Sequence, residues 1–229
     1  MNKEKVVVSI GGSILIPDNN DSFYIKRLSN LVEEVVKEVE LVIVVGGGKI
    51  ARYYTITASE LGADTYQQDM LGIGTTRLNA ELLALALGNL SSTDIPFTAE
   101  DAASRSKPGK VIVMGGTNPG HTTDAVATMV AKCMKADRVV NATSVDAVYS
   151  DDPKKNPDAK KFSNLTITEL GNLIYKDHGA GKSSVFDPLG IKIAAEEKID
   201  ILIVSGRDLD DLKNAILGKK IKGTFINSH

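Results

Sequence analysis

Three glycine clusters each follow a short run of β-branched residues, a position where backbone amides can bind phosphate. The runs read VVVSIGGSIL at 6–15, LVIVVGGGKIAR at 41–52 and VIVMGGTNPGHTTDAVA at 111–127. Ligands collect at the carboxyl ends of parallel strands, where glycine lets backbone N–H groups approach closely and a following helix adds unpaired N–H groups. One such cluster could be only a tight strand-to-helix turn, but three together favour a site for several phosphates.

The second glycine cluster could alternatively belong to a dinucleotide-binding motif. The sequence GGGKIA at 46–51 fits the loose pattern G-x-G-x-x-A after a strand. A hydride-transfer enzyme would place an acidic residue at the end of the next strand, about 20 residues on. Asp64 and Asp69 lie near that distance, but residues 52–63 continue a helix and no clear strand precedes them. Taken alone, this motif is a weak signal.

A second possible nucleotide-binding motif lacks the sequence features that normally surround it. The sequence GAGKSS at 179–184 contains the G-K-S of a phosphate-binding loop. Lys176 stands where that loop needs its first glycine, and no strand leads into it. We interpret this segment as a Gly/Ser-rich loop.

Polar residues follow the glycines of the third cluster. Thr122, Thr123 and Asp124 can cap a helix that begins near Ala125, and the same hydroxyls and N–H groups could also bind a substrate. His121 is one of three histidines in the chain. A lone loop histidine is more often solvated or hydrogen-bonded than catalytic, so we assign it no proton-transfer role.

Further polar residues follow a fourth apolar run, namely Thr143, Ser144, Asp146 and Asp152. Asp146 could anchor lysines, interact with Mg²⁺, or simply be a turn residue. Lys192 lies on an apparent short helix in VFDPLGIKIAAEE at 185–197. A lysine on a helix face is usually solvated, so Lys192 matters only if that helix end points toward the glycine loops.

The elements that must position these groups alternate along the chain. Five apolar runs predict buried strands: Val6–Ile10, Leu41–Val45, Val111–Met114, Arg138–Ala142 and Ile201–Val204. Four segments with near-helical apolar spacing predict helices: Phe23–Lys37, Thr76–Leu87, Asp124–Lys135 and Asp208–Leu217. Alternating strands and helices predict a layered α/β fold with a mostly parallel sheet.

Composition narrows the classes of function. The chain has 229 residues, 42% hydrophobic and 24% charged, which is ordinary for a globular protein. A net charge of −2 without a long Lys/Arg block argues against a nucleic-acid surface, and no apolar run approaches the roughly 20 residues that span a membrane. The single cysteine, Cys133, cannot form an internal disulfide, and its apolar-periodic surroundings favour a packing role. These features predict a cytoplasmic protein.

The ordered set of motifs resembles the amino acid kinase superfamily and, more narrowly, the archaeal type of uridylate kinase. The matches run from Gly11 to Lys192: IGGSIL, VVGGGKIAR, DMLGIGTTRLNA, MGGTNPGHTTDAVA, NATSVDAVYSDDPK and DPLGIKIA. Kinases of the same superfamily that act on isopentenyl phosphate usually have GGGSFGH where this chain has GGGKIAR. The resemblance implies a three-layer αβα sandwich with a central, mostly parallel sheet.

The resemblance also implies a role for each matching residue. ATP would be bound by Gly12, Ser13, Gly48, Arg52, Thr143, Ser144, Tyr149 and Asp152. UMP would be bound by Gly47, Thr117, Asn118, Pro119, Gly120, His121, Thr122 and Thr123, with Asp69 accepting hydrogen bonds from the ribose hydroxyls. The catalytic residues would be Arg52, Asp146 and Lys192. No residue is expected to ligate a metal directly, and Mg²⁺ would accompany ATP as co-substrate.

Three positions depart from the broader superfamily pattern. Many members carry a lysine just before the first glycine pair, where this chain has Ser9 and Ile10, and this weakens a mechanism with two lysines. Ala147 replaces a usual glycine, and a positive φ there would strain it by about 1 kcal/mol. Ser144 stands where asparagine is common, which leaves its ATP contact less defined.

The expected activity is transfer of the γ-phosphate of ATP to UMP. The resemblance further implies a homohexamer and one domain over 1–229, with an acceptor-binding lobe of about 1–150 and an ATP-binding lobe of about 151–229, divided by the Pro-, Asp- and Lys-rich segment 151–161. Three alternatives stay open from the residues. They are a same-fold kinase for another small phosphate such as isopentenyl phosphate, a dinucleotide-dependent oxidoreductase, and a non-enzymatic nucleotide sensor.

Overall fold

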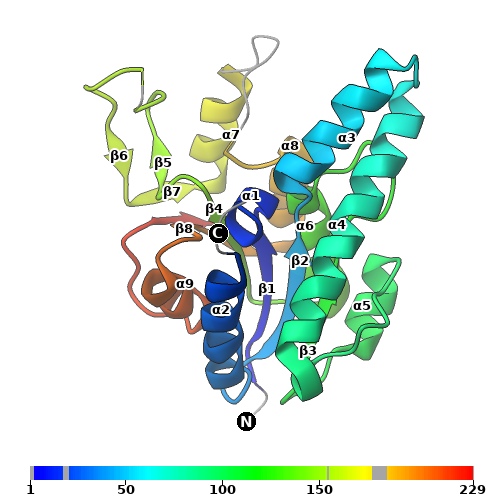
Figure 1. The fold of residues 1–229 in the computed structure, drawn as a ribbon. Coiled ribbons are helices and arrows are strands. Elements are labelled where there is room, and N and C mark those ends of the chain that lie inside the picture. The colour runs from blue at the N-terminus through cyan, green and yellow to red at the C-terminus, as the bar shows by residue number, and fades with distance from the viewer. Residues whose placement is uncertain (1–2, 18–20, 154, 177–184, 229) are drawn as a thin grey trace.

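A computed structural model describes residues 3–17, 21–153, 155–176 and 185–228 (Figure 1). Within them, seven strands form one sheet in the order β3-β2-β1-β4-β8-β9-β7. Five are parallel neighbours: β3 (Val111–Met114), β2 (Glu40–Val45), β1 (Lys5–Ile10), β4 (Arg138–Thr143) and β8 (Asp200–Ser205). β9 (Thr224–Asn227) is antiparallel to β8, and β7 (Asn164–Thr166) is parallel to β9. The expected mostly parallel sheet is confirmed.

The central strands are buried on both faces, as is usual for a parallel sheet. β1 and β2 read KVVVSI and ELVIVV, and every residue after the first in each strand is buried. Near-continuous apolar runs of this kind are typical of parallel strands covered on both sides. The register pairs Ile10 with Val45 and with Ala142, so these three strands end level with one another. Their following loops therefore start side by side.

Helices cover the two faces of the sheet as separate layers (Figure 1). α2 (Asp21–Val35), α4 (Thr65–Leu87) and α9 (Leu209–Ile216) contact one another or the sheet on one face. On the other face α6 (Thr123–Met134) packs against β1, β2 and β4, and α5 (Ala99–Arg105) and α8 (Pro188–Glu197) pack against α6. Small buried residues such as Ala127 and Ala131 let α6 fit between the sheet and these helices. The three-layer αβα sandwich is confirmed.

The remaining elements are shorter or peripheral. They are α1 (Gly12–Leu15), α3 (Gly48–Glu60), the 3₁₀ turn η1 (Gly88–Leu90), α7 (Ile167–Lys176) and a two-stranded sheet of β5 (Val148–Tyr149) and β6 (Lys161–Phe162). In the part of the chain that the structure describes, no helix combines the length and the apolar composition needed to cross a bilayer.

The expected strands and helices are present, with one large shift at a boundary. α4 was expected over Thr76–Leu87 and begins instead at Thr65. Asp64 and Gln67 form a capping box at this earlier start: the Asp64 side chain accepts from Gln67 N at 2.8 Å, and the Gln67 side chain accepts from Asp64 N at 3.0 Å. The GAGKSS motif at 179–184 lies outside the described residues.

Candidate functional site

The loops after β1 and β2 touch backbone to backbone. An added Cβ on Gly12 would lie 2.2 Å from Gly48 N and 2.4 Å from Gly46 O, so no larger residue fits without movement. Gly48 has a φ of +63°, a conformation that favours glycine. The Gly46 N–H donates to the Ile10 carbonyl at 2.9 Å, which ties the second loop to the end of β1. Two of the three glycine clusters thus form one contiguous surface.

α4 connects the second glycine loop to the third. The buried Asn79 amide donates from Nδ2 to the Gly46 carbonyl at 2.9 Å and to the Gly47 carbonyl at 3.3 Å. Three residues earlier, Thr76 Oγ1 accepts a hydrogen bond from Gly116 N at 2.7 Å. Sequence reasoning assigned no role to these two residues. The available signal was a pair of polar residues, three apart, on the buried face of a helix.

The third loop is held against α4 by the carboxylate expected to bind the acceptor. Asp69 Oδ2 accepts from Gly120 N at 2.7 Å, and Gly120 has a φ of +82°. His121 N donates to the Asn118 carbonyl at 3.3 Å, which closes a turn. The His121 Nδ1 atom is buried without a hydrogen-bond partner among the described residues. The structure therefore brings Asp69 and the loop 117–123 together.

The N-termini of α6 and α8 meet beside this loop. The Thr122 hydroxyl accepts from Ala125 N at 3.2 Å as the cap of α6, and donates to Asp187 Oδ2 at 2.7 Å. Asp187 in turn caps α8 by accepting from Leu189 N at 2.7 Å. α8 carries Lys192, whose exposed side chain has no hydrogen bond or ion pair to the described residues. The helix of Lys192 thus begins at the third loop.

Asp124 is a site residue that sequence reasoning treated only as a helix cap. Its Oδ1 accepts from Ser9 Oγ at 2.7 Å, and its Oδ2 lies 3.4 Å from Asn141 Nδ2. Burial is the main cause that raises the pKa of Asp124 to about 6; the nearby Asp187 acts in the same direction, and the hydrogen bonds from Ser9 and Asn141 act against it. Serine and asparagine inside otherwise apolar strands were the signal that could have pointed to this group.

The residues expected at the ATP nucleoside gather around the β5–β6 hairpin. Asp146 Oδ1 accepts from the Tyr149 hydroxyl at 3.0 Å, and Asp146 Oδ2 binds Lys161 Nζ at 2.6 Å. Tyr149 and Lys161 are paired residues of the antiparallel ladder. Burial alone would raise the pKa of Asp146, but the hydrogen bonds from Lys161 and Tyr149 outweigh it and lower that pKa. The lysine that Asp146 contacts is therefore Lys161, which sequence reasoning did not single out.

The other residues in this region lie at the ends of β4 and β5. Thr143 is half-buried, and its carbonyl accepts from Gly206 N at 2.8 Å, while Ser144 is exposed. Asp152 follows β5 at the start of a turn, where its carbonyl accepts from Asn156 N at 2.8 Å. Ala147 is buried and does not have a positive φ, so the strain expected there is absent.

Arg52 is a further exposed cation, on the helix that follows the second glycine loop. It lies in the second turn of α3, which begins at Gly48, and its guanidinium has no hydrogen bond or ion pair to the described residues. Ser13 lies in α1 directly after Gly12. Within the described ranges, no three His, Cys, Asp or Glu side chains lie together as a group that could hold a metal ion.

Comparisons with known proteins identify the family of this chain. A sequence profile described as the amino acid kinase family matches residues 4–205. The uridylate kinase of Methanococcoides burtonii is 43% identical over 218 residues, which cover 95% of this chain and 93% of the relative, and that of Methanobrevibacter smithii is 40% identical over 98% and 99%.

Solved structures show the same likeness. The uridylate kinase from Archaeoglobus fulgidus superposes with a TM-score of 0.87 at 40% identity, covering 97% of this chain and 99% of that one. The UMP kinase from Bacillus anthracis shares the fold at 21% identity with a TM-score of 0.81. The resemblance to the archaeal type of uridylate kinase is confirmed, and the chain belongs to the amino acid kinase family.

Proposed function

We propose that this chain is a uridylate kinase, which transfers the γ-phosphate of ATP to UMP and forms UDP and ADP in pyrimidine nucleotide biosynthesis. The observation that carries the proposal is the contact between the glycine loops after β1 and β2, to which α4 joins the loop after β3, in a chain about 40% identical to uridylate kinases over nearly its whole length. A dinucleotide-dependent oxidoreductase is not supported, because Asp69 lies on a helix and the chain belongs to a kinase family.

The ATP phosphates bind where the first two loops touch. Gly12 and Gly48 lie in backbone contact, with Ser13 and Arg52 in the helices that follow them. In this proposal their N–H groups and the guanidinium contact the phosphates. The nucleoside of ATP lies against Thr143, Ser144, Tyr149 and Asp152, and Asp146 organises this end of the site by holding Tyr149 and Lys161.

UMP binds on the other side of the same loops. Gly47 borders α4, and the segment 117–123 is held to α4 by Asp69. One oxygen of Asp69 accepts from Gly120 N, and its second oxygen has no hydrogen bond to the described residues. That second oxygen is available to accept from a ribose hydroxyl, while the first keeps the loop in place. His121 Nδ1, which is buried and has no hydrogen-bond partner among the described residues, offers a further polar contact in the same loop.

The chemistry needs positioning and charge neutralisation more than proton transfer. The attacking group is a phosphate oxygen that is already ionised near neutral pH, so no general base is required. Phosphoryl transfer then proceeds by in-line attack on the γ-phosphate, with developing charge stabilised by glycine-loop N–H groups, Arg52 and Lys192. Both cations are exposed and have no hydrogen bond or ion pair to the residues that the structure describes, which supports these roles.

Mg²⁺ enters this proposal with ATP. Because the described residues form no cluster of three acidic, His or Cys side chains, they fit an ion held by phosphate oxygens and water better than one held by a protein cage. When bound, the ion would neutralise charge on the transferred group.

The proposal also covers the oligomeric state of the protein, its place in the cell and the division of the chain into lobes. We propose a homohexamer in the cytoplasm, and an acceptor-binding lobe of about 1–150 beside an ATP-binding lobe of about 151–229. The placement of Asp69 and the loop 117–123 in the first part of the chain supports the acceptor-binding assignment of that part.

A panel of acceptors with ATP and Mg²⁺ tests the function. UMP, CMP, AMP and isopentenyl phosphate are each offered at the same concentration, and ADP and the phosphorylated product are measured by chromatography. The proposal expects kcat/KM for UMP to exceed that of every other acceptor. A higher kcat/KM for isopentenyl phosphate would make this a kinase of the same fold with a different substrate, and tight nucleotide binding without ADP formation would indicate a sensor.

A further inference from the structure

The hairpin that carries part of the ATP region is a small sheet of its own. β5 and β6 pair through two residue pairs, Val148 with Phe162 and Tyr149 with Lys161. Among the described elements, these two strands make their extensive contacts only with each other, and Figure 1 shows them apart from the seven-stranded sheet. An isolated two-stranded hairpin is only marginally stable in water, so this one needs support from elsewhere in the chain.

A buried threonine of the last strand provides that support. Thr224, the first residue of β9, is 0% exposed. Its hydroxyl donates to the Phe162 carbonyl at 2.6 Å and accepts from Val148 N at 2.9 Å. Phe162 and Val148 lie opposite each other in the ladder, so one side chain holds both strands of the hairpin. Next along β9, Phe225 N donates to the Ser163 carbonyl at 3.0 Å.

β9 connects this contact to the strand that carries the other part of the ATP region. Thr224 is paired with Ile203 of β8, and Ile203 is paired in turn with Asn141 of β4. β4 ends at Thr143. The Thr224 hydroxyl therefore joins the hairpin, which carries Tyr149, to the sheet, which carries Thr143.

The placement of the hairpin matters because two of its side chains hold Asp146. The Tyr149 hydroxyl and Lys161 Nζ both contact the Asp146 carboxylate. Each of these two residues is also the chain neighbour of a residue that is bonded to the Thr224 hydroxyl. A movement of the hairpin away from β9 would therefore displace the groups proposed to receive the nucleoside of ATP.

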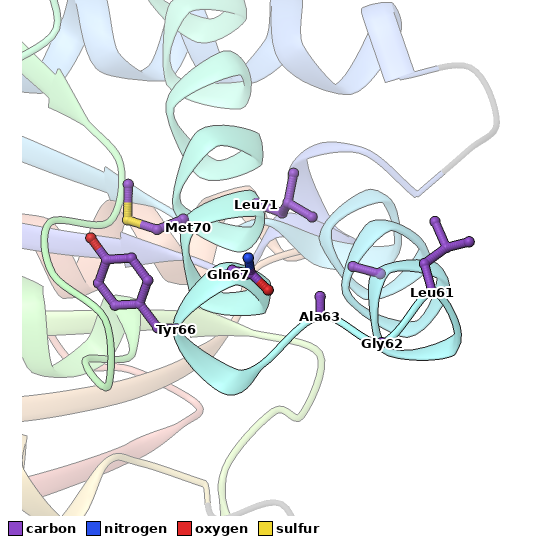
Figure 2. A pocket seen from close by; sticks show the side chains of 8 residues that line it. Leu61, Gly62, Ala63, Tyr66, Gln67, Met70 and Leu71 are labelled. Atoms are coloured by element: carbon purple, nitrogen blue, oxygen red, sulfur yellow. The ribbon is translucent and has the colours of Figure 1, made fainter.

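A hollow elsewhere in the described chain does not include these groups. It lies between the end of α3 and the start of α4, has a volume of about 740 Å³ and is lined by uncharged residues such as Leu61, Gln67 and Met70 (Figure 2). It offers no cation to the phosphates of a nucleotide. In the proposed function, ATP instead depends on the hairpin and the end of β4, and therefore on the contact that joins them.

We propose that Thr224 is a positioning residue for ATP, whose hydroxyl fixes the β5–β6 hairpin against the seven-stranded sheet so that Tyr149 and Asp146 are in place before the nucleotide binds. Without the hydroxyl, the buried Val148 N–H would lose its partner, which is unfavourable, and the hairpin would shift or open to regain one. This inference rests on the proposed function for the place of ATP, but it does not depend on the identity of the acceptor.

Calorimetric titration with ATP and Mg²⁺, without acceptor, tests the proposal. Thr224→Val removes the hydroxyl and keeps the shape, whereas Thr224→Ser keeps the hydroxyl. Ser228→Ala is the matched control, because the buried Ser228 hydroxyl donates to Asp200 Oδ1 at 2.9 Å at the amino end of β8, the opposite end from the ATP region. We expect the Kd for ATP to rise at least tenfold in Thr224→Val and to stay within twofold of the wild type in the other two.

Steady-state kinetics separate positioning from general stability. Thr224→Val should raise the KM for ATP while the KM for the acceptor stays within twofold of the wild type. An unchanged Kd for ATP in Thr224→Val, an equal rise in Ser228→Ala, or an equal rise in both KM values would overturn the proposal. Formation of UDP by the wild type is measured separately, so a failed kinase assignment and a failed positioning role give different results.

Hydrogen exchange of the wild type decides the case even if Thr224→Val does not fold. Coupling between two sites is reciprocal, so a link that favours ATP binding must itself be stabilised by ATP. We expect saturating ATP to slow exchange of the Val148 and Phe225 amides at least threefold more than that of the Ser228 amide. Slower exchange at Val148 with no such effect at Phe225 would refute the link between the hairpin and β9.

Discussion

Replacing Gly12 with alanine would put a methyl group where the two phosphate loops already touch. The new Cβ would lie 2.2 Å from Gly48 N and 2.4 Å from Gly46 O, whereas ordinary contacts of this type begin at 3.4 Å. Both neighbours are backbone atoms, of Gly46 directly after β2 and of Gly48 at the start of α3, so the loops would have to separate by roughly 1 Å. Overpacking of this kind costs about 1–3 kcal/mol of unfolding free energy.

The kinetic effect of Gly12→Ala should exceed its effect on stability. A displacement of about 1 Å at positioned groups can cost about 10²-fold in rate, so we expect kcat/KM for UMP phosphorylation to fall by about that factor. The Tm should fall by about 2–10 °C. Chromatographic measurement of ADP formation and thermal unfolding of the purified protein provide the two values.

Gly72→Ala in α4 is the matched control for the substitution itself. Its Cβ would meet only Thr55 Cγ2, at 3.8 Å, an ordinary contact. Alanine is favoured over glycine inside a helix by about 1 kcal/mol, so this variant should be slightly more stable than the wild type and equally active. If Gly12→Ala keeps the kcat/KM and the Tm of the wild type, the loops do not contact each other as described and the argument for a shared phosphate site fails.

Four further substitutions test separate parts of the site. Lys192→Ala should lower kcat at least tenfold with little change in the KM for UMP, because an exposed cation on α8 is assigned to transition-state charge. Asp69→Asn should raise the KM for UMP far more than that for ATP, measured by varying each substrate in turn. Lys161→Met should raise the KM for ATP and leave that for UMP unchanged, because it removes the contact with Asp146, which orients Tyr149. Lys161→Arg should keep the KM for ATP near the value of the wild type. Asp124→Asn should become more stable relative to the wild type as pH rises from 4.5 to 7.5, by about 2 kcal/mol in urea unfolding.

The sign of the Asp124 effect follows from the direction of its pKa shift. Burial raises that pKa from 3.8 to about 6, so between these values the folded protein holds a proton that the unfolded chain releases. The free energy of unfolding of the wild type therefore decreases as pH rises through this window, and a neutral asparagine does not share the loss. A stability difference independent of pH would show that Asp124 is not desolvated.

For each of the other three variants, one result would contradict the role assigned to the residue. An unchanged kcat in Lys192→Ala would remove that lysine from the mechanism. Equal losses for ATP and UMP in Asp69→Asn would refute the proposed division of the cleft. If the KM for UMP rises with that for ATP in Lys161→Met, the hairpin contacts serve general stability instead of nucleotide positioning.

The fold was largely predictable because its central strands carry their own signal. Val111–Met114 is apolar throughout and Val6–Ile10 is apolar except for Ser9, and the structure extends these runs by one residue at most. The short β9 and β7 were not predicted, since their sequences acquire strand structure only by pairing with β8 and with each other. The early start of α4 was missed because its apolar residues surround the helix and obscure any period, although the capping box was present in the sequence.

The site was predictable as a set of loops but not as a set of contacts. Glycines after strands indicated where phosphates would collect, and the structure places the first two loops in contact. The groups that hold the loops are distant in sequence: Asn79 reaches Gly46 across 33 positions, and Ser9 reaches Asp124 across 115. Such pairs depend on how layers stack, which a local pattern cannot show.

Positional labelling of the product tests the central claim most directly. The protein is incubated with ATP labelled at the γ-phosphate, Mg²⁺ and UMP, and the nucleotides are separated and their label located. The account predicts that the label appears at the β-phosphate of UDP, in equal amount to the ADP formed and only when UMP is present. Label released as inorganic phosphate, or UMP left unchanged while another phosphate acceptor takes the label, would contradict it.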